Sequence, residues 1–425
     1  MVILIMVAAL LVLLALRVPV AIALLVPSLI YITFDPTASF QVAAQQTISG
    51  VNSFPLLAVP LFIMLGNIAN VSGISDRLFN AATALIGHVR GSLGYVNVFT
   101  SFGFAWMSGA AISDAAALGR VQIPAMVKRG YPEGFSIGVT AGSSLIAPIL
   151  PPSIPAIIYA VTAGISVGAL FMAGIIPALV LVAVLCMTVW WGTRKRGDLR
   201  LPKAPARERV TLTLGALPAL GAGVIVLGGI LGGFFTPTEA AGIGVVYMLV
   251  LSVVYGAMKG KNFGKVLGST IETSGSVLLI VCSAALFGWV LAREQAPQQA
   301  ADLIFSLTTN PIVFLILLNV LLFIVGAVIE PTAAILILVP VLAPVATQFG
   351  LDPLHIGMVI IFNLMMGLLT PPVGLVLFVL SSVTDIPVSR IIRGVVPIYL
   401  PLIFVLFLMS FFPVITTWLP RALGY

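Results

Sequence analysis

The chain has 425 residues, enough for two or three soluble domains, but 60% of the residues are hydrophobic and only 8% are charged. With a mean hydropathy of +1.21, this composition excludes a soluble globular protein and indicates a polytopic membrane protein. The formal net charge is +7, and in such a protein basic residues are expected to mark one side of the membrane rather than a nucleic-acid site.

Ten apolar runs, on the order of 20 residues each, are long enough to cross a bilayer. The first run lacks a basic start and a small-residue cleavage site, so it is interpreted as a retained membrane helix and not as a signal peptide. The ten runs lie at 1–16, 18–34, 55–75, 134–163, 168–192, 211–234, 238–258, 272–292, 355–384 and 395–418.

Two further apolar stretches, 95–127 and 311–347, are too long for one crossing, and each contains a polar, small-residue break. We predict that both are re-entrant hairpins, which enter the bilayer and return to the same face. With that topology, 17 of the 20 basic residues fall on one side, which the positive-inside rule makes cytoplasmic. Both chain ends are then predicted to be periplasmic.

The two halves of the chain resemble each other at a nearly constant shift. Pro19 matches Pro237 (237 − 19 = 218), and the proline pair at 151–152 matches the pair at 371–372 (371 − 151 = 220). The predicted topology starts the first half outside and the second half inside. The sequence therefore predicts an all-α polytopic membrane protein built as an inverted repeat, an organisation typical of secondary transporters. A duplicated membrane scaffold without a transport role is the alternative.

The predicted organisation has two repeats and a basic linker. The first repeat spans 1–192, with scaffold helices at 1–75, a hairpin at about 95–127 and a broken helix at 134–163. The cytoplasmic linker is 193–210. The second repeat spans 211–425, with scaffold helices at 211–258, a hairpin at about 311–347 and a broken helix at 355–384.

The two broken helices follow from prolines in the middle of apolar runs, because an interior proline removes a helix hydrogen bond. Gly142, Ser143 and Ser144 precede the first break. The segment 367–374 contains the equivalent break in the second half. Such breaks leave carbonyls that can coordinate a hard cation and helix N-termini that favour an anion. A simple kink at each proline pair is the alternative.

The hairpin turns carry polar side chains at membrane depth. Ser108, Ser113 and Asp114 lie at the first turn, and an intramembrane carboxylate is a functional candidate by default. Gly326, Glu330 and Thr332 lie at the second, and Asp114 and Glu330 are separated by 330 − 114 = 216 residues, which predicts equivalent positions. The alternative is that each acid caps the returning helix, and for Glu239 capping is the favoured interpretation.

The sequence lacks the residues that several kinds of enzymatic and ATP-driven chemistry require. His88 and His355 lie at predicted membrane edges, Cys186 and Cys282 lie in apolar runs, and the chain has no Walker A loop, HExxH or GxSxG motif. The sequence therefore predicts neither an enzyme nor an ATP-driven pump.

Four ordered segments are similar to one family. The segments SGAAISDAAALG (108–119), GYPEGFSIGVTAGSSLIAPILPPSIPAIIYA (130–160), FTPTEAAG (235–242) and GLLTPPVGLVLF (367–378) resemble the large membrane subunit of tripartite ATP-independent periplasmic (TRAP) transporters. The similarity runs over essentially the entire chain. Ala110 departs from the family pattern, in which a second serine often follows Ser-Gly, so a side-chain ligand is missing there.

This resemblance implies a sodium-coupled importer of organic acids, of the C4-dicarboxylate or sialic acid type, in the bacterial inner membrane. It implies an elevator mechanism of the kind found in the wider ion-transporter group, a small four-helix membrane subunit, and a periplasmic substrate-binding protein. A self-sufficient cation-coupled carboxylate carrier is the alternative.

The residues implied by the resemblance fall into two sets. Two or more sodium ions are expected to use Ser108, Ser113, Asp114, Gly142, Gly326, Glu330, Gly367 and Thr370. The substrate is expected near Ser108, Ser144, Ser153 and Thr332.

Overall fold

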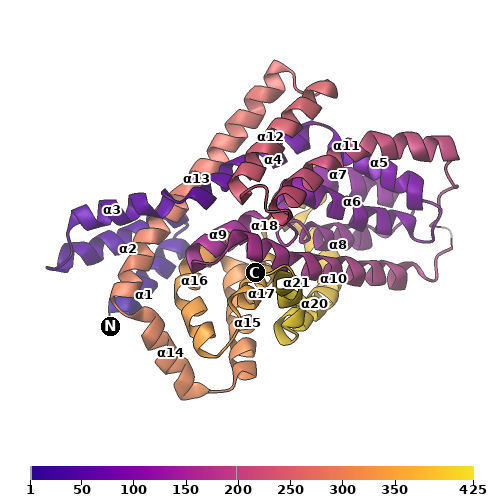
Figure 1. Ribbon diagram of the computed structural model, residues 1–425. Helices are drawn as coiled ribbons and strands as arrows, with labels where there is room; N and C mark the ends of the chain where they lie inside the picture. The colour runs from indigo at the N-terminus through magenta and orange to yellow at the C-terminus, as the bar shows by residue number, and fades with distance from the viewer. Residues whose placement is uncertain (1, 198) are drawn as a thin grey trace.

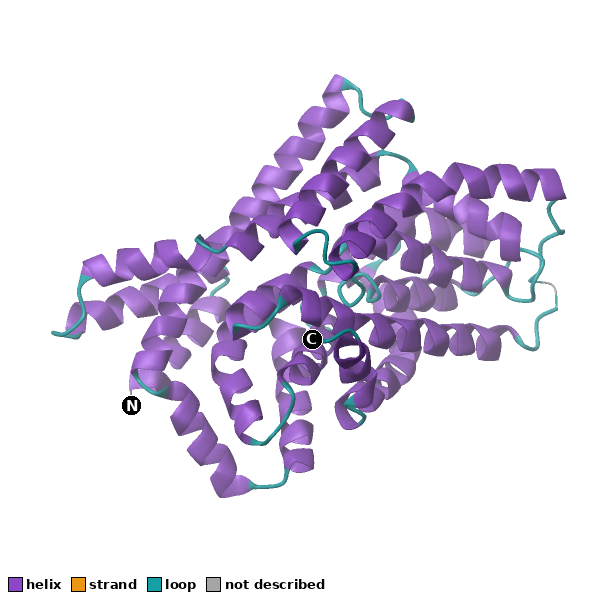
Figure 2. Ribbon diagram, in the orientation of Figure 1, coloured by secondary structure: helices purple, strands orange, loops and turns teal. Residues whose placement is uncertain are grey.

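The protein is described by a computed structural model that covers residues 2–197 and 199–425. All regular secondary structure in these ranges is helical (Figure 2). The predicted all-α class is therefore confirmed.

The first half forms ten α-helices and one short 3-10 helix. They are α1 (Val2–Ala15), α2 (Val20–Phe34), α3 (Phe40–Val51), η1 (Phe54–Leu57), α4 (Ala58–Val71), α5 (Ile74–Ile86), α6 (Ser92–Ser108), α7 (Ala111–Lys128), α8 (Glu133–Ser144), α9 (Ile154–Ala163) and α10 (Val167–Thr193).

The second half forms eleven α-helices and one 3-10 helix. They are α11 (Ala206–Leu231), α12 (Pro237–Val254), α13 (Gly260–Arg293), α14 (Ala296–Leu307), α15 (Pro311–Val328), α16 (Pro331–Gln348), α17 (Pro353–Gly367), α18 (Leu375–Thr384), α19 (Val388–Val395), η2 (Val396–Ile398), α20 (Tyr399–Phe411) and α21 (Val414–Ala422).

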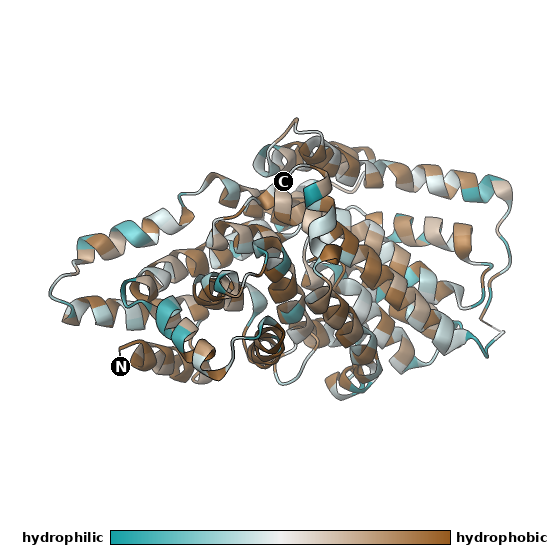
Figure 3. Ribbon diagram, turned by 60° about the horizontal axis from the view of Figure 1, so that its bottom comes forward, coloured by the Kyte–Doolittle hydropathy of each residue, from teal (hydrophilic) through white to brown (hydrophobic). Residues whose placement is uncertain are grey.

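Eight helical segments of the described chain are long and apolar enough to cross a membrane. Valines and isoleucines on the outer helices are exposed, as on a lipid-facing surface: Val224 on α11 is 60% exposed, Val246 on α12 62% and Ile271 on α13 68%. Figure 3 shows helices that are mostly hydrophobic, with hydrophilic residues at many loops and helix ends. The protein is therefore a multi-pass membrane protein.

The apolar runs placed the helices well but missed three amphipathic ones and misjudged two ends. Helices α3 and α14 lie outside every predicted span and α5 overlaps one only at residues 74–75, because periodic polar residues lower their mean hydropathy. Helix α13 has 34 residues, about 51 Å at 1.5 Å per residue, so it extends well beyond the predicted run 272–292. The predicted span 395–418 is wrong at its end, because the chain breaks at Phe412 and Pro413 before α21.

Both predicted hairpins are present as helix pairs, α6 with α7 and α15 with α16, and the members of each pair contact each other. Both predicted breaks are present as well, since α8 ends at Ser144 before α9 begins at Ile154, and α17 ends at Gly367 before α18 begins at Leu375. The course of the hairpins relative to a bilayer stays a prediction.

The two broken helices connect the two hairpins crosswise. Helix α8 packs on α6 and α7 of its own hairpin, whereas α9 packs on α16 and α17. In the same way α17 packs on α15 and α16, whereas α18 packs on α7. Figure 1 shows α9 and α18 near the centre of the molecule, between the two hairpins. We call the two hairpins with the two broken helices the central body.

The remaining helices lie against the central body. Helix α13 runs along one edge (Figure 1) and packs on α2, α3 and α4, while α12 packs on α4 and α11 packs on α5. This set meets the central body where α4, α5 and α11 contact α6 and where α13 contacts α16.

The basic linker between the halves is shorter than the sequence predicts. Helix α10 continues to Thr193 and α11 begins at Ala206. The backbone N–H of Gly91 donates to Leu199 O (3.0 Å), and that of Leu201 donates to Gly87 O (2.9 Å). The linker is thus hydrogen-bonded to the loop between α5 and α6.

Candidate functional site

The turn of the first hairpin is built around a glycine. Gly109 has φ +59°, and a Cβ added there would lie 2.5 Å from the carbonyl oxygen of Pro152. Its own carbonyl oxygen accepts a hydrogen bond from Ile154 N at 3.3 Å. Only glycine fits this left-handed position so close to the backbone of the broken helix.

The second hairpin is attached to its broken helix in the same way. The N–H of Val373, in the second break, donates to Ala327 O at 3.3 Å. The acceptors are separated by 327 − 109 = 218 residues and the donors by 373 − 154 = 219, which matches the repeat shift. Each hairpin turn is therefore bound to the break of its own half.

Asp114 is the buried acid of the first hairpin. It is 1% exposed, and neither carboxylate oxygen has a hydrogen bond of regular geometry in the described residues, although the hydroxyl of Ser101 on α6 lies near it. The N-terminal cap of α7 is Ala110, four residues earlier, so the capping alternative for Asp114 is wrong. A carboxylate that is neither exposed nor paired at membrane depth is costly unless an ion satisfies it.

Other oxygen atoms of the same hairpin are also buried without a partner. They include the hydroxyl of Ser108 at the end of α6, the hydroxyl of Thr100 and the side-chain oxygen of Gln122. Ser113, by contrast, accepts a hydrogen bond from the Asn70 side chain of α4 at 2.9 Å. A carboxylate and unpartnered oxygens in one hairpin are the kinds of ligand that a hard cation prefers.

A polar ladder that the sequence interpretation missed joins α6 to α8. Ser101 donates to Ser143 at 3.0 Å, and Ser143 donates to the Asn97 side chain at 2.9 Å. Asn97 in turn donates to Thr140 at 2.6 Å. The signal available in the sequence was a polar residue on every turn of α6, at 97 and 101.

The second half has a corresponding ladder. Asn363 of α17 donates to the side-chain oxygen of Asn319 in α15 at 2.8 Å, and Asn319 donates to Ser410 of α20 at 3.1 Å. Asn319 follows Ser101 by 218 residues and Asn363 follows Ser143 by 220. The two ladders therefore occupy equivalent positions, although the side chains differ.

Glu330 has a different role from Asp114. It is the N-cap of α16, and its carboxylate accepts a hydrogen bond from Ala333 N at 3.0 Å. The capping alternative is confirmed for Glu330, and likewise for Glu239, which forms a capping box with Thr236. The predicted equivalence of Asp114 and Glu330 is wrong, because counted from the helix start the two acids differ by four residues.

Two of the other residues predicted in the second half, Gly326 and Gly367, meet at a backbone contact. A Cβ on Gly367 would lie 2.1 Å from the carbonyl oxygen of Gly326, so α15 and α17 touch directly. Thr370 lies in the break and donates to Met366 O at 3.0 Å. Thr332, in the first turn of α16, is 9% exposed.

The remaining predicted residues of the first half are buried around the break. The hydroxyl of Ser144 donates to Ala141 O at 2.8 Å, and Ser153 caps α9 by accepting from Ala156 N at 3.2 Å. A Cβ on Gly142 would lie 2.9 Å from the side chain of Ile398, so this side of α8 packs on η2. The hydrogen bond from Ile154 N to Gly109 O places Ser108 and Ser153 near each other, and within the described residues no hydrogen bond joins either of them to Thr332.

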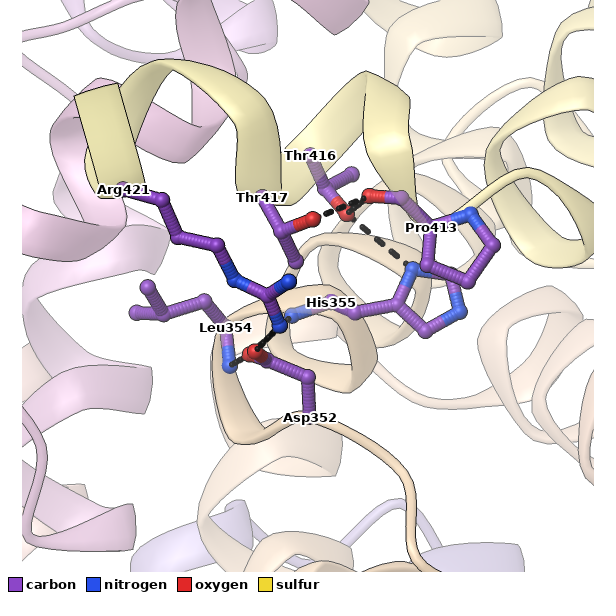
Figure 4. Close-up of polar contacts among 7 residues, drawn as sticks. All are labelled: Asp352, Leu354, His355, Pro413, Thr416, Thr417 and Arg421. Atoms are coloured by element: carbon purple, nitrogen blue, oxygen red, sulfur yellow. Dashed lines mark hydrogen bonds and ion pairs between the residues drawn. The ribbon is translucent and has the colours of Figure 1, made fainter.

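Helix α17 is held at its start by the last helix of the chain (Figure 4). Asp352 caps α17 and pairs with Arg421 of α21 at 2.9 Å. The buried ring of His355 lies 3.0 Å from the hydroxyl of Thr416, also on α21. Within the described residues no group of three potential metal-ligating side chains exists. The contact of His355 with Thr416 joins α17 to α21.

A wide cavity of about 780 Å³ lies away from the hairpins, between α1, α2 and the end of α13. At its polar end, Asp35 accepts hydrogen bonds from the hydroxyl and the backbone N–H of Thr37 and pairs with Arg293 at 3.0 Å. These hydrogen bonds and the guanidinium lower the pKa of Asp35 to about 2. The carboxylate therefore stays charged at any physiological pH.

Comparison with known proteins assigns the chain to a family. A family model described as the DctM component of the tripartite ATP-independent periplasmic transporter matches residues 7–415. The sialic acid TRAP transporter large permease protein SiaM of Vibrio cholerae is 43% identical over 409 residues, which are 96% of each chain. The C4-dicarboxylate TRAP transporter large permease protein DctM of Pseudomonas aeruginosa is 37% identical over 372 residues, 87% of each chain.

A solved structure has the same fold at low sequence identity. The crystal structure of the Alcanivorax borkumensis YdaH transporter matches with a TM-score of 0.64 and 17% identity, covering 92% of this chain and 90% of that one. This similarity supports the arrangement of the helices and carries no assignment of a substrate.

Proposed function

The chain belongs to the DctM component family of tripartite ATP-independent periplasmic transporters, and from this premise we propose that it carries an organic acid across the membrane together with sodium ions. The family is a transporter permease and not an enzyme, so the chain has a translocation role. Sodium coupling, the substrate and the mechanism are the proposed parts.

The observation that carries the sodium proposal is the carboxylate of Asp114. It is buried, lacks a hydrogen-bond partner in the described chain, and lies in the same hairpin as the unpartnered hydroxyl of Ser108. A sodium ion would balance the negative charge of the carboxylate, and the oxygen of the hydroxyl could coordinate it. These atoms therefore fit a cation better than they fit a water-free apolar core.

The residues proposed to hold sodium fall into two groups. The first group belongs to the first half and consists of Asp114, Ser108, Ser113 and the backbone of Gly142. The second group belongs to the second half and consists of Gly326, Glu330, Gly367 and Thr370. Moving one net positive charge inward along a membrane potential supplies about 2.3 kcal/mol per 100 mV, so two sodium ions with a monoanion would be driven electrically as well as by their gradient.

The substrate is proposed to be a carboxylate of the C4-dicarboxylate or sialic acid type, which are the substrates named for the two relatives. Ser153, at the N-terminus of α9, lies where the helix dipole favours an anion, next to the turn that carries Ser108. Ser144 and Thr332 complete the proposed contacts. All four residues are buried, which implies that the central body must move or open for the substrate to enter.

An elevator motion suits this architecture. The crosswise packing of α9 and α18 makes the two hairpins and two broken helices one connected unit, so we propose that the central body moves as a unit against the outer helices. The outer layer with α11, α12 and α13 would remain fixed in the membrane.

The proposed setting is the bacterial inner membrane with both termini on the periplasmic side. In this setting the chain works with a small four-helix membrane subunit and a periplasmic substrate-binding protein. The exposed apolar residues of the outer helices offer a surface for the small subunit, and the family's description as tripartite supports two partners.

The test is uptake of labelled sialic acid and labelled succinate into proteoliposomes. The vesicles contain this chain and the small subunit encoded with it, and uptake is measured with and without the periplasmic protein under an inward sodium gradient. We expect uptake that requires sodium and the periplasmic protein and that increases with an inside-negative potential.

Two results would contradict the proposal in different ways. Equal uptake without the periplasmic protein would make the chain a self-sufficient carrier. Uptake that is unchanged when choline replaces sodium would remove the proposed ion sites, while leaving the translocation role intact.

A further inference from the structure

A small polar pocket lies at the open end of the first hairpin, far along α6 and α7 from the turn. It has a volume of about 270 Å³, less than the roughly 300 to 1,000 Å³ of pockets that hold drug-sized ligands. Its floor is a separate hydrophobic cluster made by Leu93, Met126, Tyr131 and Leu199. A pocket of this size accommodates one small group, not a whole metabolite.

Three basic side chains surround the pocket. Lys128 and Arg129 come from the end of α7, and Arg200 comes from the linker between the halves. All three are exposed, and no carboxylate pairs with any of them in the described chain. Lys128 in the last turn of α7 and Arg129 at its C-cap both lie where a cation stabilises the helix dipole, but Arg200 in the linker does not have that role.

The first turn of α6 points hydrogen-bond donors at the same pocket. Ser92 lines it and is 1% exposed, yet its hydroxyl has no hydrogen-bond partner in the described residues. The next amide, that of Leu93, donates to the Tyr131 hydroxyl at 3.2 Å, and the amide of Gly94 donates to Gly91 O. The amide and hydroxyl of Ser92 thus remain as open donors at a helix N-terminus, where an anion is favoured.

The pocket is held in shape before any ligand arrives. The two backbone hydrogen bonds between the linker and the loop 87–91 place Arg200 between the bonded residues Leu199 and Leu201. Tyr131 stacks on Phe135 with ring centroids 6.2 Å apart. A preorganised pocket loses less entropy when it binds a ligand.

We propose that this pocket binds a phosphate group, and that the phosphate belongs to an anionic phospholipid with an exposed phosphate ester. The charge of the pocket is positive, its open donors are a hydroxyl and an amide, and its size suits a single phosphate with its ester linkage.

The neighbouring tryptophans point to a lipid as the source. Trp190 and Trp191 near the end of α10 are 53% and 64% exposed, as expected for residues at a membrane interface. The guanidinium of Arg194 lies 3.9 Å from the ring centre of Trp191. Thr193 fills the space beside Gly91, the residue that precedes Ser92, so the pocket lies at the same level as these tryptophans.

The experiment measures thermal unfolding of the purified full-length chain in a neutral detergent, read by tryptophan fluorescence. The probes are dihexanoyl phosphatidic acid, dihexanoyl phosphatidylcholine and inorganic phosphate. We expect saturable stabilisation by phosphatidic acid, weaker stabilisation by inorganic phosphate, and none by phosphatidylcholine, whose choline group screens the phosphate.

Matched variants distinguish binding at the pocket from a nonspecific effect of positive charge. The pocket variant carries Lys128→Gln, Arg129→Gln and Arg200→Gln, and the control carries Lys259→Gln, Lys261→Gln and Lys265→Gln, three charges that precede or open α13. The pocket variant should weaken phosphatidic acid binding by about tenfold or more, and the control by less than about twofold. Ser92→Ala, which leaves the charge unchanged, should weaken it by about threefold to tenfold.

Each possible result supports or contradicts a stated part of the proposal. Equal affinity for inorganic phosphate and phosphatidic acid would keep the phosphate site but overturn the lipid as its source. Equal loss in the pocket variant and its control, no effect of Ser92→Ala, or no saturable stabilisation of the unmodified chain would overturn the site itself. None of these readouts depends on transport, so they stand apart from the proposed function.

Discussion

The two hairpin units of this protein have the same backbone plan and different polar chemistry. In each half a hairpin turn accepts a hydrogen bond from the break of its own broken helix, at matching positions. The first unit holds a buried, unpartnered carboxylate at Asp114, whereas the second uses its acid, Glu330, to cap a helix. The difference indicates that the two units share a backbone framework, whereas the unpartnered carboxylate is found in the first one.

The largest expected effect comes from removing that charge. Asp114→Asn should lower the apparent sodium affinity of uptake by at least about tenfold, because the carboxylate is the proposed ion ligand. Sodium-dependent uptake in proteoliposomes measures this. Glu330→Gln, which keeps an oxygen able to cap α16, should have a much smaller effect, and equal effects of the two changes would restore the equivalence that the structure removes.

The hairpin-to-break contacts should be the next most sensitive. Gly367→Ala should destabilise the protein by about 1–3 kcal/mol or more, since the new Cβ would lie 2.1 Å from Gly326 O. Gly109→Ala should have a similar effect through its positive φ and its closeness to Pro152. Gly268→Ala on α13 is the control, because nothing lies within 4 Å of its added Cβ. Thermal unfolding of the three variants in detergent would compare them, and a tolerated alanine at 367 would contradict the close contact.

The N-terminal caps of α16 and α7 can be compared by removing a capping side chain from the first and adding one to the second. Glu330→Ala should destabilise the protein by about 1 kcal/mol, because Ala333 N loses its acceptor. Ala110→Ser places a capping side chain at the corresponding position of α7, and should stabilise it by up to a similar amount. Denaturant or thermal unfolding would show opposite signs for the two changes. The same sign for both would mean that capping does not limit stability at these turns.

The two polar ladders should contribute modestly and unequally. Asn363→Ala removes a side chain that makes two hydrogen bonds to Asn319, and should cost about 0.6 kcal/mol and at most about 1.7. Ser143→Ala removes a smaller group and should cost less. A double-mutant cycle with Asn319→Ala would give the coupling energy of the pair, and a coupling of zero would show that the ladder does not join α15 to α17.

The smallest effects are expected where each broken helix begins. Arg421→Ala breaks the 2.9 Å pair with Asp352, and should cost about 0.2–1 kcal/mol because the arginine is largely exposed. Arg390→Ala breaks a longer and more exposed contact of 3.9 Å with Glu133 and should have no measurable effect on unfolding. A larger effect of Arg390→Ala would reverse this ranking of the two contacts.

Much of the fold could be predicted because long apolar runs indicate membrane helices and prolines indicate where they break. The breaks at 148–155 and 367–374 and the small-residue turns were placed correctly, since these residues cannot continue a helix. The amphipathic helices α3, α5 and α14 were missed because no apolar run marks them. Asn97, Ser101 and Asn319 were missed as site neighbours because a polar residue in a helix does not show which helix it faces.

The sequence by itself determined the membrane class, the family, the two hairpins and the two breaks, because each depends on composition or on the local limits of proline and glycine. Only the tertiary structure decided that α9 and α18 cross to the opposite hairpin, and that Glu330 caps a helix while Asp114 remains unpartnered. It also decided that Arg200 reaches the base of the first hairpin. These facts depend on which surfaces meet in space, and residues far apart in the chain acquire common neighbours only when the helices pack.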